Sequence, residues 1–135
     1  MALLTWNDSY SVGVNALDGQ HTGLFETLNE LHAAMMKGQA KSLTGPILKR
    51  LIEYTQEHFT AEEAMMEATK YPRLAQHRAK HRELTHQVVE FTGRFDRGEI
   101  ALSPEILTFL RDWLTVHIMQ EDQRYGPWLN EHGMR

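Results

Sequence analysis

The chain has 135 residues, of which 41% are hydrophobic and 24% charged, so its length and composition suit one globular domain with a single core. The formal net charge of -4 and the lack of a Lys/Arg cluster argue against a nucleic-acid partner. The absence of cysteine excludes disulfides, thiolate zinc sites and iron–sulfur clusters, and it leads us to expect a cytoplasmic protein. No apolar run approaches the roughly 18 residues of a membrane span.

The chain begins with a segment that shows no helical periodicity, and we expect an extended arm over residues 1–16. A first helix is predicted over residues 17–38, because apolar side chains recur at three- and four-residue intervals and Gly38 ends the pattern. A second helix is predicted over residues 44–69, starting at Thr44-Gly45-Pro46. It ends before Tyr71-Pro72.

Two further helices are predicted from the same kinds of signal, apolar periodicity and residues that start or end a helix. One is predicted over residues 72–97, opening at Pro72 and closing at Gly98, and one over residues 103–121, opening at Ser103-Pro104. Residues 122–135 are predicted to form a short tail. Short connections between four helices indicate an all-α fold, an antiparallel up-down-up-down four-helix bundle, in one domain spanning residues 1–135.

Seven polar side chains occupy positions on the helix faces where such a bundle usually places leucine. In an up-down-up-down bundle, the starts of the first and third helices lie at the same end as the ends of the second and fourth. All seven residues therefore lie at one level of the bundle: His21, His58, Glu62, His77, His81, His117 and Asp122.

The spacing within each helix tests whether these side chains can point inward together. His58 and Glu62 are four residues apart, as are His77 and His81, so each pair shares one helix face. This spacing favours Glu62 over its neighbour Glu63. The next pair, at 117 and 122, is five residues apart, which leaves the two side chains about 140° apart on a regular helix. Both can reach one site only if the helix ends or loosens there, for instance by a π-type turn.

A single histidine on an apolar face is most often an ordinary core residue, but seven polar groups at one level are a different case. Burying an uncompensated carboxylate costs several kcal/mol, whereas a small domain has a net stability of about 5–15 kcal/mol. The sequence therefore predicts a metal site. The other histidines, His32, His86 and His132, lie away from this level and are predicted not to be ligands.

The ligand set indicates two metal ions. Five imidazoles and two carboxylates are too many for one ion, and mixed nitrogen and oxygen ligands suit iron, manganese, zinc, copper or nickel. Two carboxylates that bridge a metal pair would account for the set. If both ions were six-coordinate iron with a bridging oxide or hydroxide, only one position would stay open. One vacancy suits a small diatomic ligand better than a large substrate.

In several of its motifs the sequence resembles the bacterial hemerythrins. The resemblance rests on Trp6-Asn7-Asp8, Val12-Gly13-Val14, Leu17-Asp18, Gln20-His21, H-x-x-x-E at 58–62, H-x-x-x-H at 77–81 and H-x-x-x-x-D at 117–122. It implies two iron ions with a bridging oxo or hydroxo group and reversible dioxygen binding. It also implies that His77, His81 and His117 hold one iron, that His21 and His58 hold the other, and that Glu62 and Asp122 bridge them.

The resemblance implies a dioxygen store, carrier or supplier to an oxygenase rather than an enzyme, with at most a weak peroxidase or oxidase side activity, and we expect a monomer. One alternative is an oxygen- or redox-sensing module, but we expect a stand-alone binder, because the 135 residues show no pattern of a signalling domain beside the bundle. Another is a di-iron ferroxidase or oxidase, a class that uses paired E-x-x-H motifs. Only Glu83-x-x-His86 matches that motif, and it lies away from the cluster.

Apolar residues next to the predicted ligands suit the wall of a dry pocket: Leu24, Phe59, Trp113, Leu114 and Ile118. Such a lining would exclude water and protons from bound dioxygen. Tyr125 lies about one turn after Asp122, and we expect it to contact the site from outside the ligand set.

Overall fold

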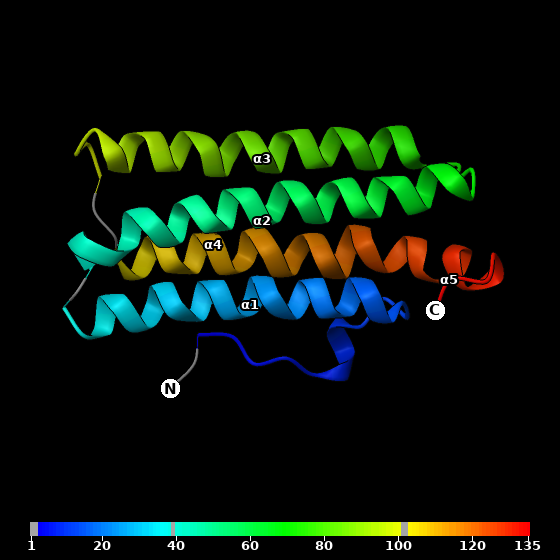
Figure 1. Cartoon of the computed structure of the whole chain (residues 1–135), viewed down its shortest axis with the longest axis horizontal. Helices are drawn as coiled ribbons and strands as arrows, with labels where there is room; N and C mark the ends of the chain where they lie inside the picture. Colours follow the sequence, from blue (N-terminus) through cyan, green and yellow to red (C-terminus); the bar gives the residue numbers. More distant parts are fainter. Residues whose placement is uncertain (1–2, 39, 101–102) are drawn as a thin grey trace.

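The computed structural model of the chain describes residues 3–38, 40–100 and 103–135. Its elements, in order, are the 3-10 helix η1 (Asp8–Tyr10), α1 (Asn15–Met36), α2 (Ala40–Ala68), α3 (Leu74–Asp96), α4 (Pro104–His117), the π-helix η2 (Ile118–Asp122) and α5 (Gln123–Glu131). Figure 1 shows that the four long helices run alternately in opposite directions. The predicted all-α, up-down-up-down four-helix bundle is confirmed.

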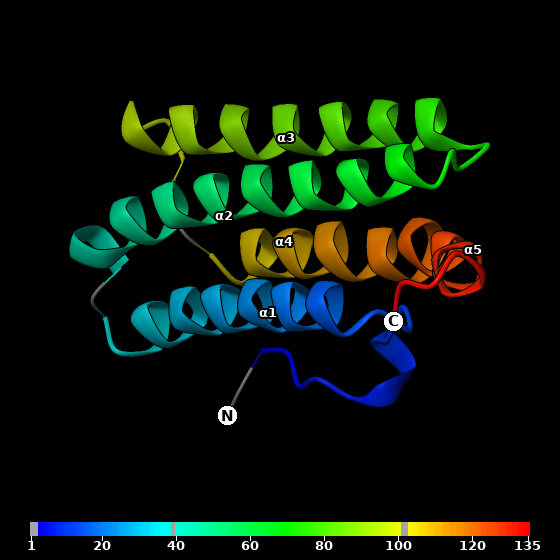
Figure 2. The same ribbon diagram turned by 45° about the vertical axis from the view of Figure 1, so that its right-hand side comes forward.

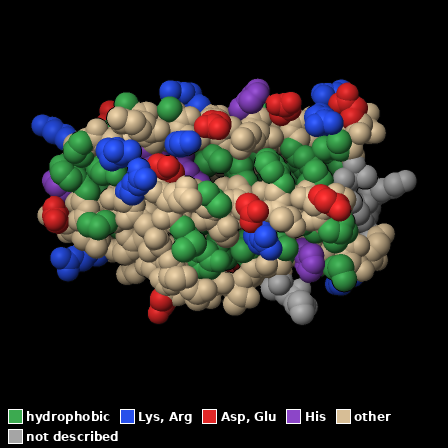
Figure 3. Space-filling model, turned by 180° about the vertical axis from the view of Figure 1, so that it is seen from behind, with side chains coloured by type: hydrophobic (Ala, Val, Ile, Leu, Met, Phe, Trp, Pro, Cys, Tyr) green, Lys and Arg blue, Asp and Glu red, His purple; other side chains and the backbone are tan. Residues whose placement is uncertain are grey.

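The helices pack so that α1 lies against α2, α2 against α3, and α4 against α1 (Figures 1 and 2). None of the helices in the described ranges is both long enough and apolar enough to cross a membrane. On the face that Figure 3 shows, patches of hydrophobic side chains reach the surface beside charged ones.

The core consists of two apolar clusters with a polar level between them. The larger cluster fills most of the bundle and contains Leu24, Leu28, Leu31, Leu48, Leu51, Leu110 and Ile118, each almost fully buried. The smaller cluster lies at the opposite side of the polar level and contains Leu17, Met66, Tyr71, Tyr125 and Leu129. Each buried side chain of this size contributes about 1.5–3 kcal/mol. The two clusters therefore stabilise the end of the bundle where the polar residues lie.

The N-terminal arm runs along α1 (Figure 2) and is fixed there by specific contacts. The backbone of Leu4 forms two hydrogen bonds with the side chain of Asn29, at 2.8 and 2.9 Å. Trp6 and Tyr10 pack edge-on against Phe25, with ring centroids 5.4 and 4.9 Å away. The arm is shorter than the sequence indicated, because η1 interrupts it and α1 already begins at Asn15.

The start of the second helix also differs from the prediction. α2 begins at Ala40, four residues before Thr44, and Pro46 lies inside it. Proline lacks the N–H that would bond four residues back, so it removes one hydrogen bond near the start of the helix without ending it. Ser103-Pro104 acts as predicted: the Ser103 hydroxyl accepts a hydrogen bond from the Ile106 N–H at 3.3 Å, and Pro104 is the first residue of α4.

The prediction of a short tail was wrong for most of its length, because α5 extends from Gln123 to Glu131. The tail contains Gly126-Pro127, a pair of residues that usually marks a turn and ends a helix. A Cβ atom at Gly126 would overlap the carbonyl oxygen of Val12, so glycine is present there to let the arm approach the helix. Pro127 falls in the first turns of α5, where it removes only one backbone hydrogen bond.

The end of α2 contains an unusual backbone conformation. Lys70 has a φ of 57°, and it is the one residue other than glycine with positive φ in the described part of the chain. The Tyr71 N–H donates to the Met66 carbonyl at 2.9 Å, and the Lys70 N–H donates to the Glu67 carbonyl at 3.1 Å. This is the Schellman arrangement, in which the left-handed position is usually glycine.

We predict that Lys70→Gly stabilises the protein by about 1 kcal/mol, because glycine adopts this conformation without the steric cost that a Cβ atom brings. Urea unfolding of both proteins would measure the difference. Lys70→Ala keeps the Cβ atom and serves as the control, which should leave the free energy of unfolding nearly unchanged. A Lys70→Gly variant no more stable than Lys70→Ala would contradict this explanation.

Candidate metal centre

The helices bring all seven predicted site residues to one level near one end of the bundle. α1 supplies His21, α2 supplies His58 and Glu62, and α3 supplies His77 and His81. The last two residues, at 117 and 122, come from the end of α4 and from η2. Every one of the seven side chains is buried, with at most 6% of its surface exposed.

The donor atoms form two groups that share both carboxylates. His77, His81 and His117 approach one another and both acids within 4.8 Å, and so do His21 and His58 on the other side. The division into three and two histidines is the one that the family resemblance implies. Because Glu62 and Asp122 belong to both groups, they stand where ligands shared between two ions would stand.

The two carboxylates face these groups differently. Oδ1 of Asp122 lies 2.9 Å from Nε2 of His77 and 2.9 Å from Nε2 of His117, whereas Oδ2 lies 3.1 Å from Nε2 of His21. Each oxygen of Asp122 therefore faces one group. Glu62 uses a single oxygen, since Oε1 lies 2.9 Å from Nε2 of His58 and 3.5 Å from Nε2 of His81.

The geometry of these approaches fits metal coordination better than hydrogen bonding. Nε2 of all five histidines, Oε1 of Glu62 and both carboxylate oxygens of Asp122 are buried without a hydrogen-bond partner of acceptable angle. Unpartnered buried polar atoms are rare and costly. In an octahedral shell with bonds of about 2.1 Å, neighbouring ligand atoms lie about 3.0 Å apart. The spacing and the nitrogen and oxygen donors thus fit a pair of iron ions.

The π-helix explains how residues five apart reach one site. Residues Ile118–Asp122 form η2, and the N–H of Gln123 bonds to the Ile118 carbonyl five residues back. Widening the helix by one residue brings Asp122 onto the same face as His117. The loosening that the His117–Asp122 spacing required is confirmed.

Two residues outside the ligand set orient imidazole rings. Nδ1 of His58 lies 2.5 Å from Oε1 of Gln20, and Nδ1 of His81 lies 2.8 Å from Oε2 of Glu63. A proton held on Nδ1 leaves the Nε2 lone pair free for a metal. Sequence reasoning missed both roles. Gln20 and Glu63 are each adjacent to a site residue and point about 100° away from it, so periodicity gives no sign of their role.

Tyr125 contacts the site as expected. Its fully buried hydroxyl donates a hydrogen bond to Oε2 of Glu62. Burial and the nearby charges of Glu62 and Asp122 raise the pKa of Tyr125 well above its usual value, so the phenol keeps its proton. The hydrogen bond holds Glu62 with Oε1 directed toward the histidines.

In the absence of metal, burial and neighbouring charges have opposing effects on the pKa values of the cluster. Burial raises the pKa of Asp122, but the neighbouring His117, His21 and His77 outweigh it and lower the pKa well below its usual value. The pKa of Glu62 is lowered in the same way, with His58 and His81 outweighing burial and the charge of Asp122. Burial lowers the pKa values of His21 and His117, but the carboxylates raise them overall.

The five apolar side chains predicted for the pocket wall are all buried. Phe59 stacks on the His81 ring, with centroids 3.7 Å apart and planes within 3°. The other four predicted wall residues are also buried: Leu24, Trp113, Leu114 and Ile118. The three remaining histidines lie elsewhere. His32 and His132 belong to neither donor group, and the side chain of His86 is 77% exposed beside Glu90.

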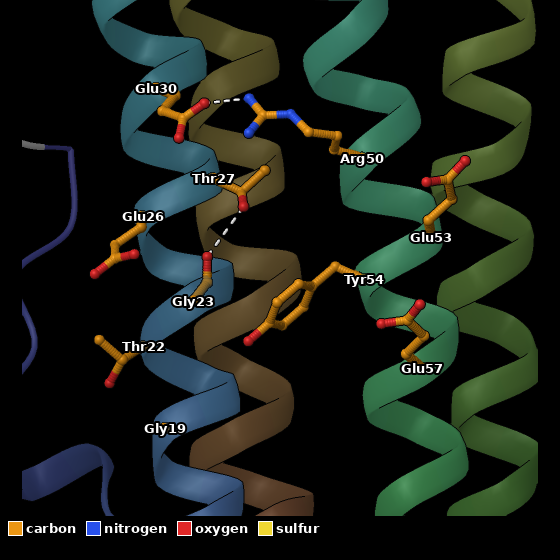
Figure 4. Close-up of a pocket in the computed structure, with 10 residues that line it drawn as sticks. All are labelled: Gly19, Thr22, Gly23, Glu26, Thr27, Glu30, Arg50, Glu53, Tyr54 and Glu57. Carbon is orange, nitrogen blue, oxygen red and sulfur yellow. Dashed lines mark hydrogen bonds and ion pairs between the residues drawn. The ribbon is translucent and has the colours of Figure 1, made fainter.

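A cavity of about 490 Å³ lies between α1 and α2, and Figure 4 shows its lining. Tyr54 extends across it toward Gly23, and Glu30 pairs with Arg50 at one end. None of the seven site residues lines this cavity, so it is separate from the candidate metal centre.

Comparison with known proteins agrees with this geometry. Residues 12–129 match the family model described as the hemerythrin HHE cation binding domain. The chain belongs to the hemerythrin family. Among curated members, a bacteriohemerythrin of Stenotrophomonas maltophilia is 37% identical over 98% of this chain and 85% of its own length. A bacteriohemerythrin of Methylococcus capsulatus is 35% identical, with coverage of 96% and 99%.

More distant hemerythrins match as well. Myohemerythrin-1 of Phascolopsis gouldii is 33% identical over 89% of both chains. The crystal structure of a wild-type hemerythrin superposes with a TM-score of 0.87 at 34% identity, covering 95% of this chain and 98% of the other. The family resemblance seen in the sequence motifs is therefore confirmed.

We predict that rising pH lowers the stability of the iron-free protein but strengthens iron binding by the loaded protein. A raised histidine pKa stabilises the folded state below pH 6.5, and this contribution is lost as the pH rises through the raised value. The iron-free protein should therefore lose stability between about pH 6 and about pH 8.5, where the carboxylates stay ionised. With iron, protons compete with the metal for the imidazoles, so metal binding weakens as the pH falls.

Urea unfolding of both forms at the two pH values would test this prediction, with the iron content measured in each sample. An iron-free protein that becomes more stable as the pH rises would show that the histidines are not held protonated by Glu62 and Asp122.

Proposed function

We propose that the seven clustered side chains hold the di-iron centre at which this hemerythrin binds dioxygen reversibly. As a member of the family, the chain is an oxygen-binding protein rather than an enzyme. The observation that carries the residue assignment is the set of inward-facing donor atoms without partners, divided into two groups that share both carboxylates.

The two donor groups support a specific division of the ligands. His77, His81 and His117 would hold one iron, and His21 and His58 the other, with Glu62 and Asp122 shared between them. A bridging oxo or hydroxo group would complete the centre. The group with two histidines supplies fewer protein donors, so we assign the open position for dioxygen to that side. When bound, the iron pair supplies the electrons that dioxygen takes up and returns.

The protein's own residues keep this chemistry reversible. The buried side chains of Phe59, Trp113 and Ile118 exclude water and protons, whose arrival would promote loss of reduced oxygen from the site. Tyr125 keeps its proton and holds Glu62 in place. Gln20 and Glu63 fix the rings of His58 and His81, so that little rearrangement accompanies ligand binding.

For the biological role, we propose a cytoplasmic monomer that stores dioxygen or supplies it to an oxygenase. The absence of cysteine supports a reducing compartment. Large exposed apolar side chains are spread over α1, α3, α4 and η2, as is normal for monomers. The E-x-x-H pair does not support a ferritin-like oxidase, because Glu83 and His86 have side chains that are 60% and 77% exposed.

Metal analysis combined with absorption spectra in air and after evacuation tests the function directly. We expect about two irons per chain and a colour that appears in air and disappears under vacuum. His77→Ala should lower the iron content to about one per chain or less, because it removes a donor from the three-histidine group. His86→Ala is the matched control and should keep full iron content. Equal iron in both variants would rule out His77 as a ligand.

A substitution in the pocket wall tests how dioxygen is protected. We predict that Ile118→Thr keeps iron but accelerates autoxidation roughly tenfold, because a hydroxyl beside the site admits water and protons. Ile118→Val keeps the wall apolar and should oxidise at a rate close to that of the unaltered protein. An unchanged rate in Ile118→Thr would remove Ile118 from the pocket wall.

A further inference from the structure

Three grooves on the bundle lie near the candidate metal centre, and only two of them include one of its residues. The groove between α3 and α4, of about 330 Å³, is lined by His117. The groove between α2 and α3, of about 410 Å³, is lined by His81. The groove between α1 and α2, shown in Figure 4, contains four glutamates but no site residue.

The α3–α4 groove combines acidic side chains with a wall that includes one of the site residues. Its lining includes the carboxylates of Glu83, Asp112 and Glu121, and His117 forms part of its wall. Nε2 of His117 is buried and has no hydrogen-bond partner. At 6% exposure, His117 is also the most exposed of the seven site residues. A cation that enters this groove therefore meets carboxylates first and then the ring of His117, whose Nε2 lies on the inner side, 2.9 Å from Oδ1 of Asp122.

The α2–α3 groove is less acidic, because one carboxylate and one guanidinium line it, whereas three carboxylates and the ammonium of Lys80 line the α3–α4 groove. Arg82 lines it, and its one carboxylate, Glu63, already pairs with Arg78 at 3.1 Å and with His81 at 2.8 Å. A guanidinium at the rim repels a divalent cation, and no free carboxylate remains to attract it. Of the two grooves that reach the cluster, the α3–α4 groove therefore has the charge that better attracts a divalent cation.

Within the α3–α4 groove, Glu121 is the carboxylate available to a cation. Glu83 lies 3.8 Å from Lys80, and Asp112 lies 3.2 Å from Arg111. Glu121 forms no ion pair within the described part of the chain. It also precedes Asp122 in η2, so its backbone is continuous with that of a site residue.

We propose that ferrous ions reach the buried cluster through the α3–α4 groove, where Glu121 attracts the ion and His117 is the first site residue to receive it. This inference rests on the proposed di-iron site and adds the route by which the metal arrives and leaves. The π-helix supports it, because a π-helical turn interrupts regular α-helical bonding and lowers the cost of local opening. Opening of η2 would move Asp122 and uncover His117 together.

The test compares rates of iron uptake and iron release under anaerobic conditions. Uptake is followed by adding ferrous ion to iron-free protein, quenching with a chelator and measuring retained iron over time. Release is followed from the loaded protein in excess chelator. Glu121→Gln should slow uptake and release by the same factor, roughly three- to tenfold, because a route residue changes the barrier and leaves the final iron content unchanged. Lys80→Gln, which removes a rim cation, should accelerate both.

Glu57→Gln is the matched control, since it removes the same charge from the more acidic α1–α2 groove of Figure 4. It should change neither rate. Faster release from Glu121→Gln would show that Glu121 stabilises bound iron rather than the passage of iron, and it would overturn the proposal. Unchanged rates in Glu121→Gln, or slower uptake in Glu57→Gln, would also overturn it. A protein that never retains two irons would instead contradict the proposed function.

Discussion

The structure depends on one electrostatic constraint, the convergence of five imidazoles and two carboxylates in a space closed to water. The inward-facing Nε2 atoms, Oε1 of Glu62 and both carboxylate oxygens of Asp122 have no hydrogen-bond partners. In the iron-free cluster, protons on the histidines partly balance the two acids, which is why the pKa values of His21 and His117 are raised and those of the carboxylates lowered. A pair of divalent ions would more than offset the two negative charges and would also occupy the donor atoms.

The rest of the fold compensates for placing such a cluster in the core. Two apolar clusters enclose the polar level, one filling the long part of the bundle and one built from α5, the start of α1 and the end of α2. α5 is essential to the second cluster, because Tyr125 and Leu129 are fully buried in it. Tyr125 therefore has two roles, packing among apolar side chains while its hydroxyl holds Glu62. The same residue thus contributes to the stability of the fold and to the orientation of Glu62.

Access to the centre follows from how the helices meet. Grooves lie between α1 and α2, between α2 and α3 and between α3 and α4, and the last of these is the one beside His117. The π-helix lies at the same place. The element that brings Asp122 onto the same face as His117 is thus also a part of the bundle wall whose backbone bonding departs from the α-helical pattern. Ile118 and Trp113, which we propose as apolar wall, lie in η2 and near the end of α4, so the proposed protection of dioxygen and the proposed passage of metal would share one region.

The sequence alone determined the helical bundle, the level of the polar cluster and the family, because these follow from spacing along single helices and from the order of the helices. It also indicated the π-turn, since His117 and Asp122 could not otherwise share a face. Only the tertiary structure decided the role of α5, the start of α2, the orienting contacts of Gln20 and Glu63, and the groove at His117. Those features depend on contacts between residues far apart in the chain, such as Gly126 with Val12 and His58 with Gln20, which local periodicity does not encode.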